Sequence, residues 1–236
     1  MNNRKGGKLP LLFGYRPLIA LLLCGNMITA GLIIQQTQKH TAAAPATSAS
    51  ATDCSKVPAS LSAVKISPKR PGLTHVASDP LYYDVGGATL AEINTRMAAC
   101  GTATQGEFAA STSYVINWQI SYQTTHSGQC QVDKVSVGLH TQSTYPRRSD
   151  IDDAIANSWY TFMQHLTTHE AGHVALDKQY ATQILHTLQE LPADNCQAID
   201  QKATATASSL VRSLDQANNN YDAATGHGRT QGAALQ

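Results

Sequence analysis

The sequence of 236 residues contains few charged side chains. Asp, Glu, Lys and Arg make up 14% of it, and the formal net charge is +1. A nucleic-acid-binding domain carries a clustered basic surface, and an acidic solvating tail carries runs of Asp and Glu, so the composition argues against both. Hydrophobic residues make up 42%, which is enough to form a core. The length is enough for one domain of ordinary size with an additional tail.

The sequence has one long run without charge, and it lies near the N-terminus. Residues 18–34 contain no charged side chain and follow a basic start at residues 4–16. The run is at the short end of a spanning helix, ~17–25 residues, and longer than the core of a signal peptide, ~7–15 residues. The basic flank favours the cytoplasmic side, which places the rest of the chain outside. We therefore expect a signal anchor, or transmembrane segment, over residues 1–40, with cleavage after Ala30 as the alternative.

Cysteine is scarce, and no two cysteines have the C-x-x-C spacing that would favour a cysteine-based metal site. One of the five, Cys24, lies in the apolar run. An even number remains, and in an exported chain this suggests two disulfides with three possible pairings. These four are Cys54, Cys100, Cys130 and Cys196. Buried free thiols are the alternative.

The segment after the anchor has the composition of a linker. Residues 41–52 are small and polar without periodicity, and residues 53–80 are rich in proline. We expect residues 41–80 to be a flexible spacer and an extended surface segment. The folded domain is then expected over residues 81–236.

The first half of this domain has the pattern of strands and one short helix. Residues 81–85 predict a strand, and Thr89 and Glu92 have the spacing of a capping box at the start of a helix. Residues 108–123 and 131–140 are rich in β-forming residues and are separated by a turn that contains glycine. This pattern predicts an antiparallel hairpin.

The second half predicts two helices. Apolar residues recur at helical spacing over residues 151–191, with Ser149 or Asp150 as the cap. A last helix is expected over residues 196–217, where three consecutive asparagines should end it. The fold class that follows is α+β, a small antiparallel sheet packed on a long helix plus a C-terminal helix.

The motif that carries chemistry lies in the long helix. Residues 169–173 read HEAGH, which fits H-E-x-x-H. His169 and His173 lie one turn apart on one face, so both imidazoles can bind one zinc ion. Glu170 is rotated by ~100° from His169, which places its carboxylate beside the metal rather than on it. It can then take a proton from a water that zinc makes acidic, and deliver it to a leaving amine.

Chance placement of the pattern is improbable. With nine His and four Glu among 236 residues, random placement gives roughly 0.006 expected matches to the motif. Gly172 inside the motif costs a helix ~1 kcal/mol, which suggests close packing or ligand approach at that position. The alternative is a pair of core histidines beside an ion-paired glutamate.

A catalytic zinc ion usually has three protein ligands, so a third must come from elsewhere in the chain. Gln179 occupies the position where a metzincin carries its third histidine. His165 shares the face of the motif, but it is ~12 Å along the axis from His173 and cannot join that pair on one ion. His227, between two glycines after the last helix, is the preferred third ligand. The other candidates are His126, His140, Glu190 and Asp222.

Three further features have a functional and a structural interpretation. Asp177, one turn after His173, either orients a ligand histidine or is a solvated helix residue. Tyr221 either stabilises an oxyanion or simply packs. The strand at residues 108–123 could offer its edge to an extended peptide.

Four stretches of the chain resemble a known family. They are residues 82–97, the strand with Trp118, residues 158–185 with the HEAGH motif, and residues 221–233, which read YDAATGHGRTQGA. Together they are similar to the bacterial domain-of-unknown-function family 922, described as predicted secreted zinc-dependent proteases. The resemblance implies a zincin-like arrangement, an envelope role and His227 as the third ligand.

These observations predict a zinc-dependent metallopeptidase or related amide hydrolase with Glu170 as the catalytic residue. The metal ligands are expected to be His169, His173 and His227, and the cofactor Zn²⁺. We expect a peptide or protein substrate in the cell envelope, contact with the inner membrane through the N-terminal segment, and a location on its periplasmic side. The chain is secreted if the segment is cleaved. The alternative function is a non-catalytic zinc-binding envelope protein that binds a partner.

Overall fold

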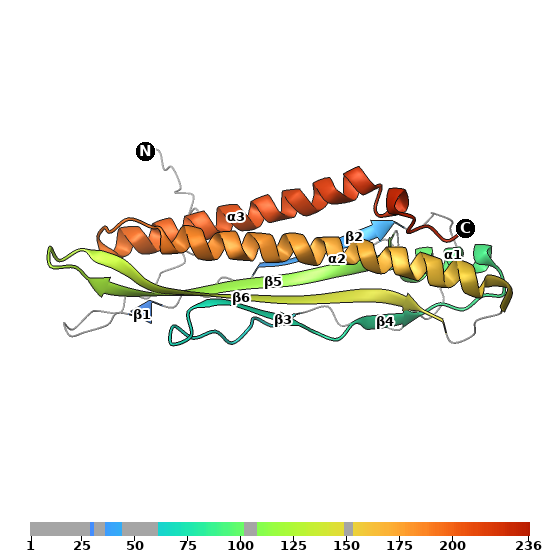
Figure 1. The fold of residues 1–236 in the computed structure, drawn as a ribbon, viewed down its shortest axis with the longest axis horizontal. Coiled ribbons are helices and arrows are strands. Elements are labelled where there is room, and N and C mark those ends of the chain that lie inside the picture. The colour runs from blue at the N-terminus through green and yellow to red at the C-terminus, as the bar shows by residue number, and fades with distance from the viewer. Residues whose placement is uncertain (1–28, 31–35, 44–60, 102–107, 149–152) are drawn as a thin grey trace, which may run out of the picture.

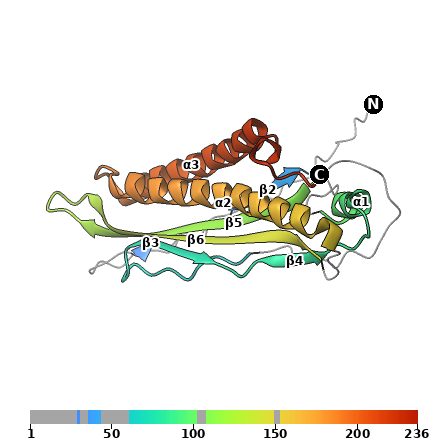
Figure 2. The ribbon, with the colours of Figure 1, turned by 45° about the vertical axis from the view of Figure 1, so that its right-hand side comes forward.

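The computed structural model describes residues 29–30, 36–43, 61–101, 108–148 and 153–236. In this part of the chain, two long helices lie side by side over one face of a mixed sheet (Figure 1). The helices are α2 (Asp153–Gln189) and α3 (Cys196–Thr225), and a short helix, α1 (Leu90–Cys100), packs near one end (Figure 2). The architecture therefore has helices and strands in separate layers, as expected for the α+β class.

The predicted hairpin forms the centre of the sheet. β5 (Phe108–Thr124) and β6 (Cys130–Arg147) pair antiparallel along almost their whole length. Alternate residues of β5, from Tyr114 to Tyr122, face the helices and are buried. The hairpin is thus confirmed, and both strands are longer than predicted.

The prediction of a purely antiparallel sheet is wrong. β3 (Gly72–Ala77) and β4 (Leu81–Asp84) both pair with β6 in the parallel direction. The strand at residues 81–85 was expected, but its direction was not. Alternation of apolar residues identifies a strand without stating which way its neighbour runs, so the direction depends on the path of the chain.

Sheet structure begins before residue 81. β3 lies inside the segment 41–80 that we expected to be spacer and extended surface. Two further strands, β1 (Thr29–Ala30) and β2 (Gln36–Ala43), pair antiparallel with β5 on its other side. The spacer prediction therefore missed two paired strands, β3 and the part of β2 that falls within it.

The buried face of α2 joins two separate apolar clusters. One cluster packs the first turns of α2, including Trp159 and Leu166, against α1, β4 and the chain end. The other packs the last turns of α2, including Ile184 and Leu188, against the sheet and α3. Between the two clusters the same face of α2 carries buried polar residues instead of apolar ones. These are His169, Glu170, His173 and Asp177.

α3 is longer than predicted, because the three asparagines at residues 218–220 do not end it. Asn218 is fully buried, and its side chain is hydrogen-bonded to both His173 and Asp177 of α2. Asparagine is unfavourable inside helices mainly because it competes for backbone hydrogen bonds, and here the side chain has other partners. Helix α3 ends instead at Gly226, which has the left-handed conformation of a helix C-terminus.

Two local predictions are confirmed by the structure. Thr89 caps α1, and the reciprocal bonds between Thr89 and Glu92 complete the capping box. A disulfide joins Cys130, at the start of β6, to Cys196, at the start of α3. Cys100 is disulfide-bonded as well. The disulfide between Cys130 and Cys196 fixes one end of the helix pair to the sheet.

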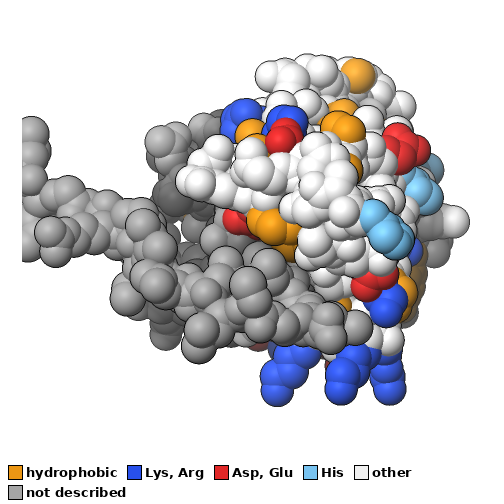
Figure 3. All heavy atoms as spheres, turned by 90° about the vertical axis from the view of Figure 1, so that its left-hand side faces the viewer, with side chains coloured by type: hydrophobic (Ala, Val, Ile, Leu, Met, Phe, Trp, Pro, Cys, Tyr) orange, Lys and Arg blue, Asp and Glu red, His pale blue; other side chains and the backbone are white. Residues whose placement is uncertain are grey.

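The predicted anchor lies mostly outside the described residues, but Thr29–Ala30 of β1 and residues 36–40 of β2 fall within it. The proposed cap residues Ser149 and Asp150 also lie outside them. No helix in the described ranges is long and apolar enough to cross a bilayer. At the end of the molecule that carries the β5–β6 turn, hydrophobic side chains are scattered, and Lys and Arg gather at the lower edge (Figure 3).

Candidate metal site

Three potential metal ligands converge where α2 crosses the last turns of α3. His169 and His173 come from successive turns of α2, and Asp222 comes from α3. The Oδ1 atom of Asp222 lies 3.2 Å from Nε2 of His169 and 3.0 Å from Nε2 of His173, and the two Nε2 atoms are 3.3 Å apart. All three residues are buried. The structure therefore brings the two predicted histidines together with a carboxylate that was one of the alternative ligands.

The spacing of these three atoms fits one tetrahedral zinc ion. Zinc binds imidazole nitrogen and carboxylate oxygen at ~2.0–2.1 Å, so two ligand atoms at a tetrahedral angle are ~3.3 Å apart. The separations of 3.0 to 3.3 Å in the structure are close to this value. Two histidines and one carboxylate also leave a fourth position open, as in catalytic zinc sites.

The protonation of both imidazoles follows from their other nitrogen. Nδ1 of His169 lies 2.8 Å from Oε1 of Gln231, and Nδ1 of His173 lies 2.8 Å from Oδ1 of Asn218. An amide oxygen only accepts, so each Nδ1 must carry the proton and donate it. In the neutral imidazoles both Nε2 atoms then present lone pairs to each other and to the Asp222 carboxylate. Three lone pairs facing one point favour a cation there.

The orientation of Asn218 is set by a carboxylate behind it. Its Nδ2 donates to Oδ1 of Asp177 at 3.2 Å, which turns its Oδ1 toward His173. Asp177 is fully buried, so the interpretation as a solvated helix residue is wrong. Asp177 acts on the histidine through Asn218 rather than directly. Such chains fix the ring and its tautomer in metal sites.

Glu170 lies beside this group and is not part of it. Its Oε2 accepts a hydrogen bond of 2.7 Å from the Thr112 hydroxyl of β5, and its Oε1 is buried with no hydrogen-bond partner in the described structure. Thr112 lies in the row of β5 side chains that faces the helices, two residues before Tyr114. The sheet thus holds one carboxylate oxygen and leaves the other available.

The environment raises the pKa of two carboxyl groups near the site and lowers that of a third. Burial raises the pKa of Glu170 to about 7, although nearby His173, Thr112 and His169 act against it. Burial opposes ionisation of Asp222 too, but its contacts with the two histidines outweigh this effect and lower its pKa to about 2. Burial also raises the pKa of Asp177 to about 7. The histidine Nε2–H that lowers this pKa is the proton that a cation between the three atoms would replace, so Asp222 is charged in either state.

Gly172 is required by Tyr221. The Tyr221 ring stacks on the His169 ring, with centroids 5.0 Å apart, and lies over the Gly172 backbone. A Cβ on residue 172 would be 2.9 Å from Cε1 of Tyr221 and closer still to its Cζ and hydroxyl oxygen. The Tyr221 hydroxyl donates to the His169 carbonyl and accepts from Gln231. The close packing predicted at Gly172 is therefore confirmed, and Tyr221 packs and supports His169.

His227 lies next to the three ligand atoms without joining their group. Its Nδ1 is 3.8 Å from Oδ1 of Asp222, and its backbone has a positive φ of 54°. His227 as a metal ligand stays a prediction. The other candidates lie outside the group as well: His126 is exposed in the β5–β6 turn, His140 is hydrogen-bonded to Ser78 and Ser62, and Glu190 is exposed after α2.

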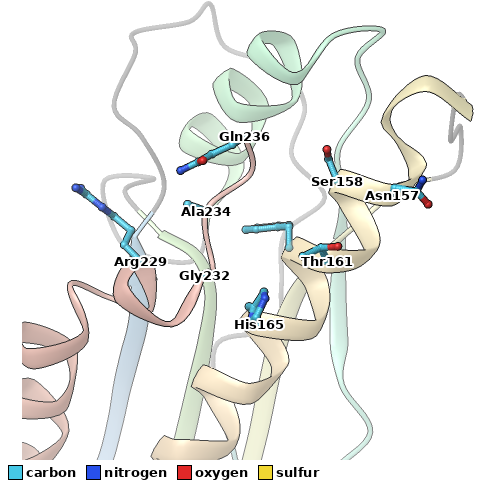
Figure 4. A pocket seen from close by; sticks show the side chains of 9 residues that line it. Asn157, Ser158, Thr161, His165, Arg229, Gly232, Ala234 and Gln236 are labelled. Carbon is cyan, nitrogen blue, oxygen red and sulfur yellow. The ribbon is translucent and has the colours of Figure 1, made fainter.

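A pocket of about 420 Å³ lies next to the site, between α2 and the C-terminal segment (Figure 4). His165 points into it and packs on Gly232. None of the three ligand residues lines this pocket. The C-terminal segment, which lines the pocket through Gly232, also contacts His169 through Gly228 and Gln231.

Sequence reasoning missed three residues that support the site: Thr112, Asn218 and Gln231. The only signal for Asn218 was its position four residues before Asp222, which puts both on one face of a helix. That signal was obscured because consecutive asparagines indicate a helix end. Thr112 and Gln231 are distant in sequence from the motif, and no local pattern marks them.

Fold and site together define an α+β protein with a buried two-histidine, one-carboxylate site on a helix pair. The chain belongs to the family described as bacterial protein of unknown function (DUF922), whose family model matches residues 81–228. That match includes His169, Glu170, His173 and Asp222. No curated protein and no solved structure matches the chain.

Proposed function

We propose that this protein is a zinc-dependent hydrolase that cleaves amide bonds, most simply those of peptides. The observation that carries the proposal is the convergence of His169 Nε2, His173 Nε2 and Asp222 Oδ1 within 3.3 Å of one another. All three offer lone pairs, and their spacing fits tetrahedral zinc. A zincin-like arrangement is part of this proposal.

Different residues of the site would bind the ion and orient its ligands. His169, His173 and Asp222 would hold the ion, while Gln231 and Asn218 keep each imidazole turned toward it. Zinc in such a site supplies the Lewis acidity that lets water ionise near neutral pH. One coordination position would be left for water and substrate if His227 stays outside the ligand set.

Glu170 is the proton carrier. Thr112 holds its Oε2, so the free Oε1 is the atom that accepts a proton from water as it attacks the amide carbonyl. The same oxygen then delivers that proton to the amine as the C–N bond breaks. The water oxygen and its second proton end in the new carboxylic acid, and the proton carried by Glu170 ends on the leaving amine. At neutral pH the acid then loses its proton and the amine gains one, so atoms and charge balance.

The substrate and its location complete the proposal. We propose a peptide or protein of the cell envelope, with the domain on the periplasmic side of the inner membrane. The apolar run at residues 18–34 and the disulfide between Cys130 and Cys196 support an oxidising compartment.

The test is the Glu170→Gln variant of the zinc-loaded protein, assayed for zinc content and for hydrolysis of fluorescent casein. The amide is nearly isosteric but cannot accept the proton, so we expect one zinc per chain and a loss of at least about 100-fold in rate. Glu190→Gln is the matched control, since Glu190 is exposed just after the same helix.

The outcome separates the two functional classes. Zinc binding with no casein hydrolysis in the unchanged protein would favour the non-catalytic zinc-binding alternative. Hydrolysis that survives in Glu170→Gln at the rate of Glu190→Gln would contradict the role of Glu170.

A further inference from the structure

The catalytic group of the proposed hydrolase is closed to solvent. His169, Glu170 and His173 have no exposed surface, and the Asp222 side chain is only 8% exposed. A peptide has to reach Glu170 before it can be cleaved. Part of the structure around Glu170 therefore has to move or be replaced by the substrate.

The strand next to Glu170 is the place where a peptide would fit. Thr112 of β5 holds Glu170, so the outer edge of β5 at this residue lies beside the reacting groups. An extended peptide can pair with a strand edge through its backbone, with little demand on its sequence. That edge is taken by β2, where His40 is the pairing partner of Thr112 and Thr41 that of Ser111.

The position of β2 relative to the helices supports this assignment. β2 contacts α3, which carries Asp222, and α2, which carries the two histidines, as well as β5. It thus runs between the sheet edge and the helix pair, along the elements that form the site. β2 is extended and pairs antiparallel with β5, and an extended peptide can pair with the same strand edge.

We infer that β2 is an internal occupant of the peptide-binding edge of β5, and that a substrate binds as an extended strand in its place. This inference rests on the proposed function. Peptide can bind only to molecules in which the edge is open. The apparent affinity is therefore the intrinsic affinity multiplied by the fraction of such molecules, and β2 keeps this fraction small. The protein is thereby held in a low-activity state until β2 leaves or is displaced.

The C-terminal segment is the other cover of the site, and it is less suited to leave. Gln231 accepts the Nδ1 proton of His169, and Ala233 and Leu235 are buried in the cluster around α1. Its departure would disturb the ligand histidine and expose apolar surface. Displacement of β2 leaves both of these contacts in place.

The first experiment opens the edge in the full-length, zinc-loaded Glu170→Gln protein, so that no peptide is consumed. In an antiparallel pair, the backbone N–H and C=O groups of one residue point at the partner strand, and those of the next residue point away from it. The double variant His40→Pro/Thr41→Pro therefore removes a backbone donor toward β5 in either register. Val76→Pro is the control, since it places a proline in β3, which pairs with β6 and does not touch the outer edge of β5.

The probe is a fluorescein-labelled peptide with the β2 sequence, QTQKHTAA, followed by fluorescence anisotropy. We expect the double variant to bind it at least about tenfold more tightly than both the parent and the Val76→Pro control. Equal affinity in all three proteins would overturn the inference. Zinc content and circular dichroism verify that each protein is folded.

A second measurement needs no change in β2. Hydrogen exchange of the Glu170→Gln protein is followed by mass spectrometry with and without an excess of the unlabelled peptide. We expect exchange to accelerate at residues 36–43, as the added peptide displaces β2, and to stay unchanged at residues 228–236. Acceleration at residues 228–236 alone, or at neither segment, would contradict the inference.

Both readouts report binding and not turnover, so they separate this inference from the proposed function. Peptide binding at the β5 edge together with a lack of casein hydrolysis would leave the inference standing and refute catalysis. Casein hydrolysis without any competition between the peptide and β2 would support catalysis and refute this inference.

Discussion

At the scale of single residues, the site depends on side chains that do not touch the proposed ion. Asn218 accepts the Nδ1 proton of His173 and is itself held by Asp177. Gln231 does the same for His169 and is held by Tyr221. Each imidazole thus has its ring position and its tautomer fixed by an amide whose own orientation is fixed.

Replacing Asn218 by Ala should weaken zinc binding about 10- to 100-fold, because His173 loses the acceptor that keeps its Nε2 unprotonated. Isothermal titration of zinc into chelator-treated protein measures the change. Asn219→Ala is the matched control, since Asn219 is the exposed neighbour in the same helix and should bind zinc like the unchanged protein. Equal affinities of the two variants would refute the positioning role of Asn218.

The Gly172→Ala change is expected to destabilise this protein, although a change from glycine to alanine usually stabilises a helix. In an ordinary helix it would stabilise the protein by about 1 kcal/mol. Here the added Cβ meets the Tyr221 ring, so we expect the free energy of unfolding to fall by about 1–3 kcal/mol. Denaturant unfolding tests this value. In a Tyr221→Ala background the same change should be neutral or stabilising, and a loss of equal size in both backgrounds would contradict the packing argument.

The residues of the site were predictable to different degrees. The H-E-x-x-H spacing identified His169, Glu170 and His173 because a helix fixes which side chains share a face. Asp222 was one candidate among several, since a ligand from another helix depends on how the two helices pack. No spacing within a single element contains that information.

At the scale of elements, the hairpin, α1 and the two long helices followed from local patterns, whereas strand directions did not. The capping box at Thr89 and the alternation in β5 involve residues close in sequence. The parallel pairing of β3 and β4 with β6 is set by the route of the chain around the sheet. Local sequence was also insufficient at Asn218, because a buried partner on α2 overrides the preference of asparagine to end a helix.

The disulfide between Cys130 and Cys196 ties the sheet to α3 across a sequence separation of 66 residues. Closing a loop of this length stabilises a folded chain by about 4 kcal/mol in the chain-entropy account. We expect the Cys130→Ala/Cys196→Ala protein to lose about 2–4 kcal/mol of unfolding free energy, measured by denaturant titration. Zinc affinity should stay unchanged, because the ligands lie at the other end of α3. Unchanged stability would show that this disulfide does not constrain the unfolded chain.

At the scale of the whole molecule, the polar site lies between the two apolar clusters along α2. A bound ion would link α2 to α3 at the point where neither cluster does so. Binding to the folded state alone stabilises it by about 2.7 kcal/mol when free zinc is 100 times the Kd. We therefore expect chelation to lower the melting temperature of the unchanged protein by several degrees.

The His173→Ala protein is the control for this effect. It keeps both apolar clusters but lacks one ligand, so its melting temperature should not respond to chelator or to added zinc. A response equal to that of the unchanged protein would place the stabilising ion elsewhere.

We propose above that His169, His173 and Asp222 hold one divalent cation. A crystal of the zinc-loaded protein, with diffraction data collected on both sides of the zinc absorption edge, tests it most directly. We predict a single anomalous peak bonded to Nε2 of both histidines and to Oδ1 of Asp222. No peak between these three atoms, or a peak bonded to other residues, would contradict the account.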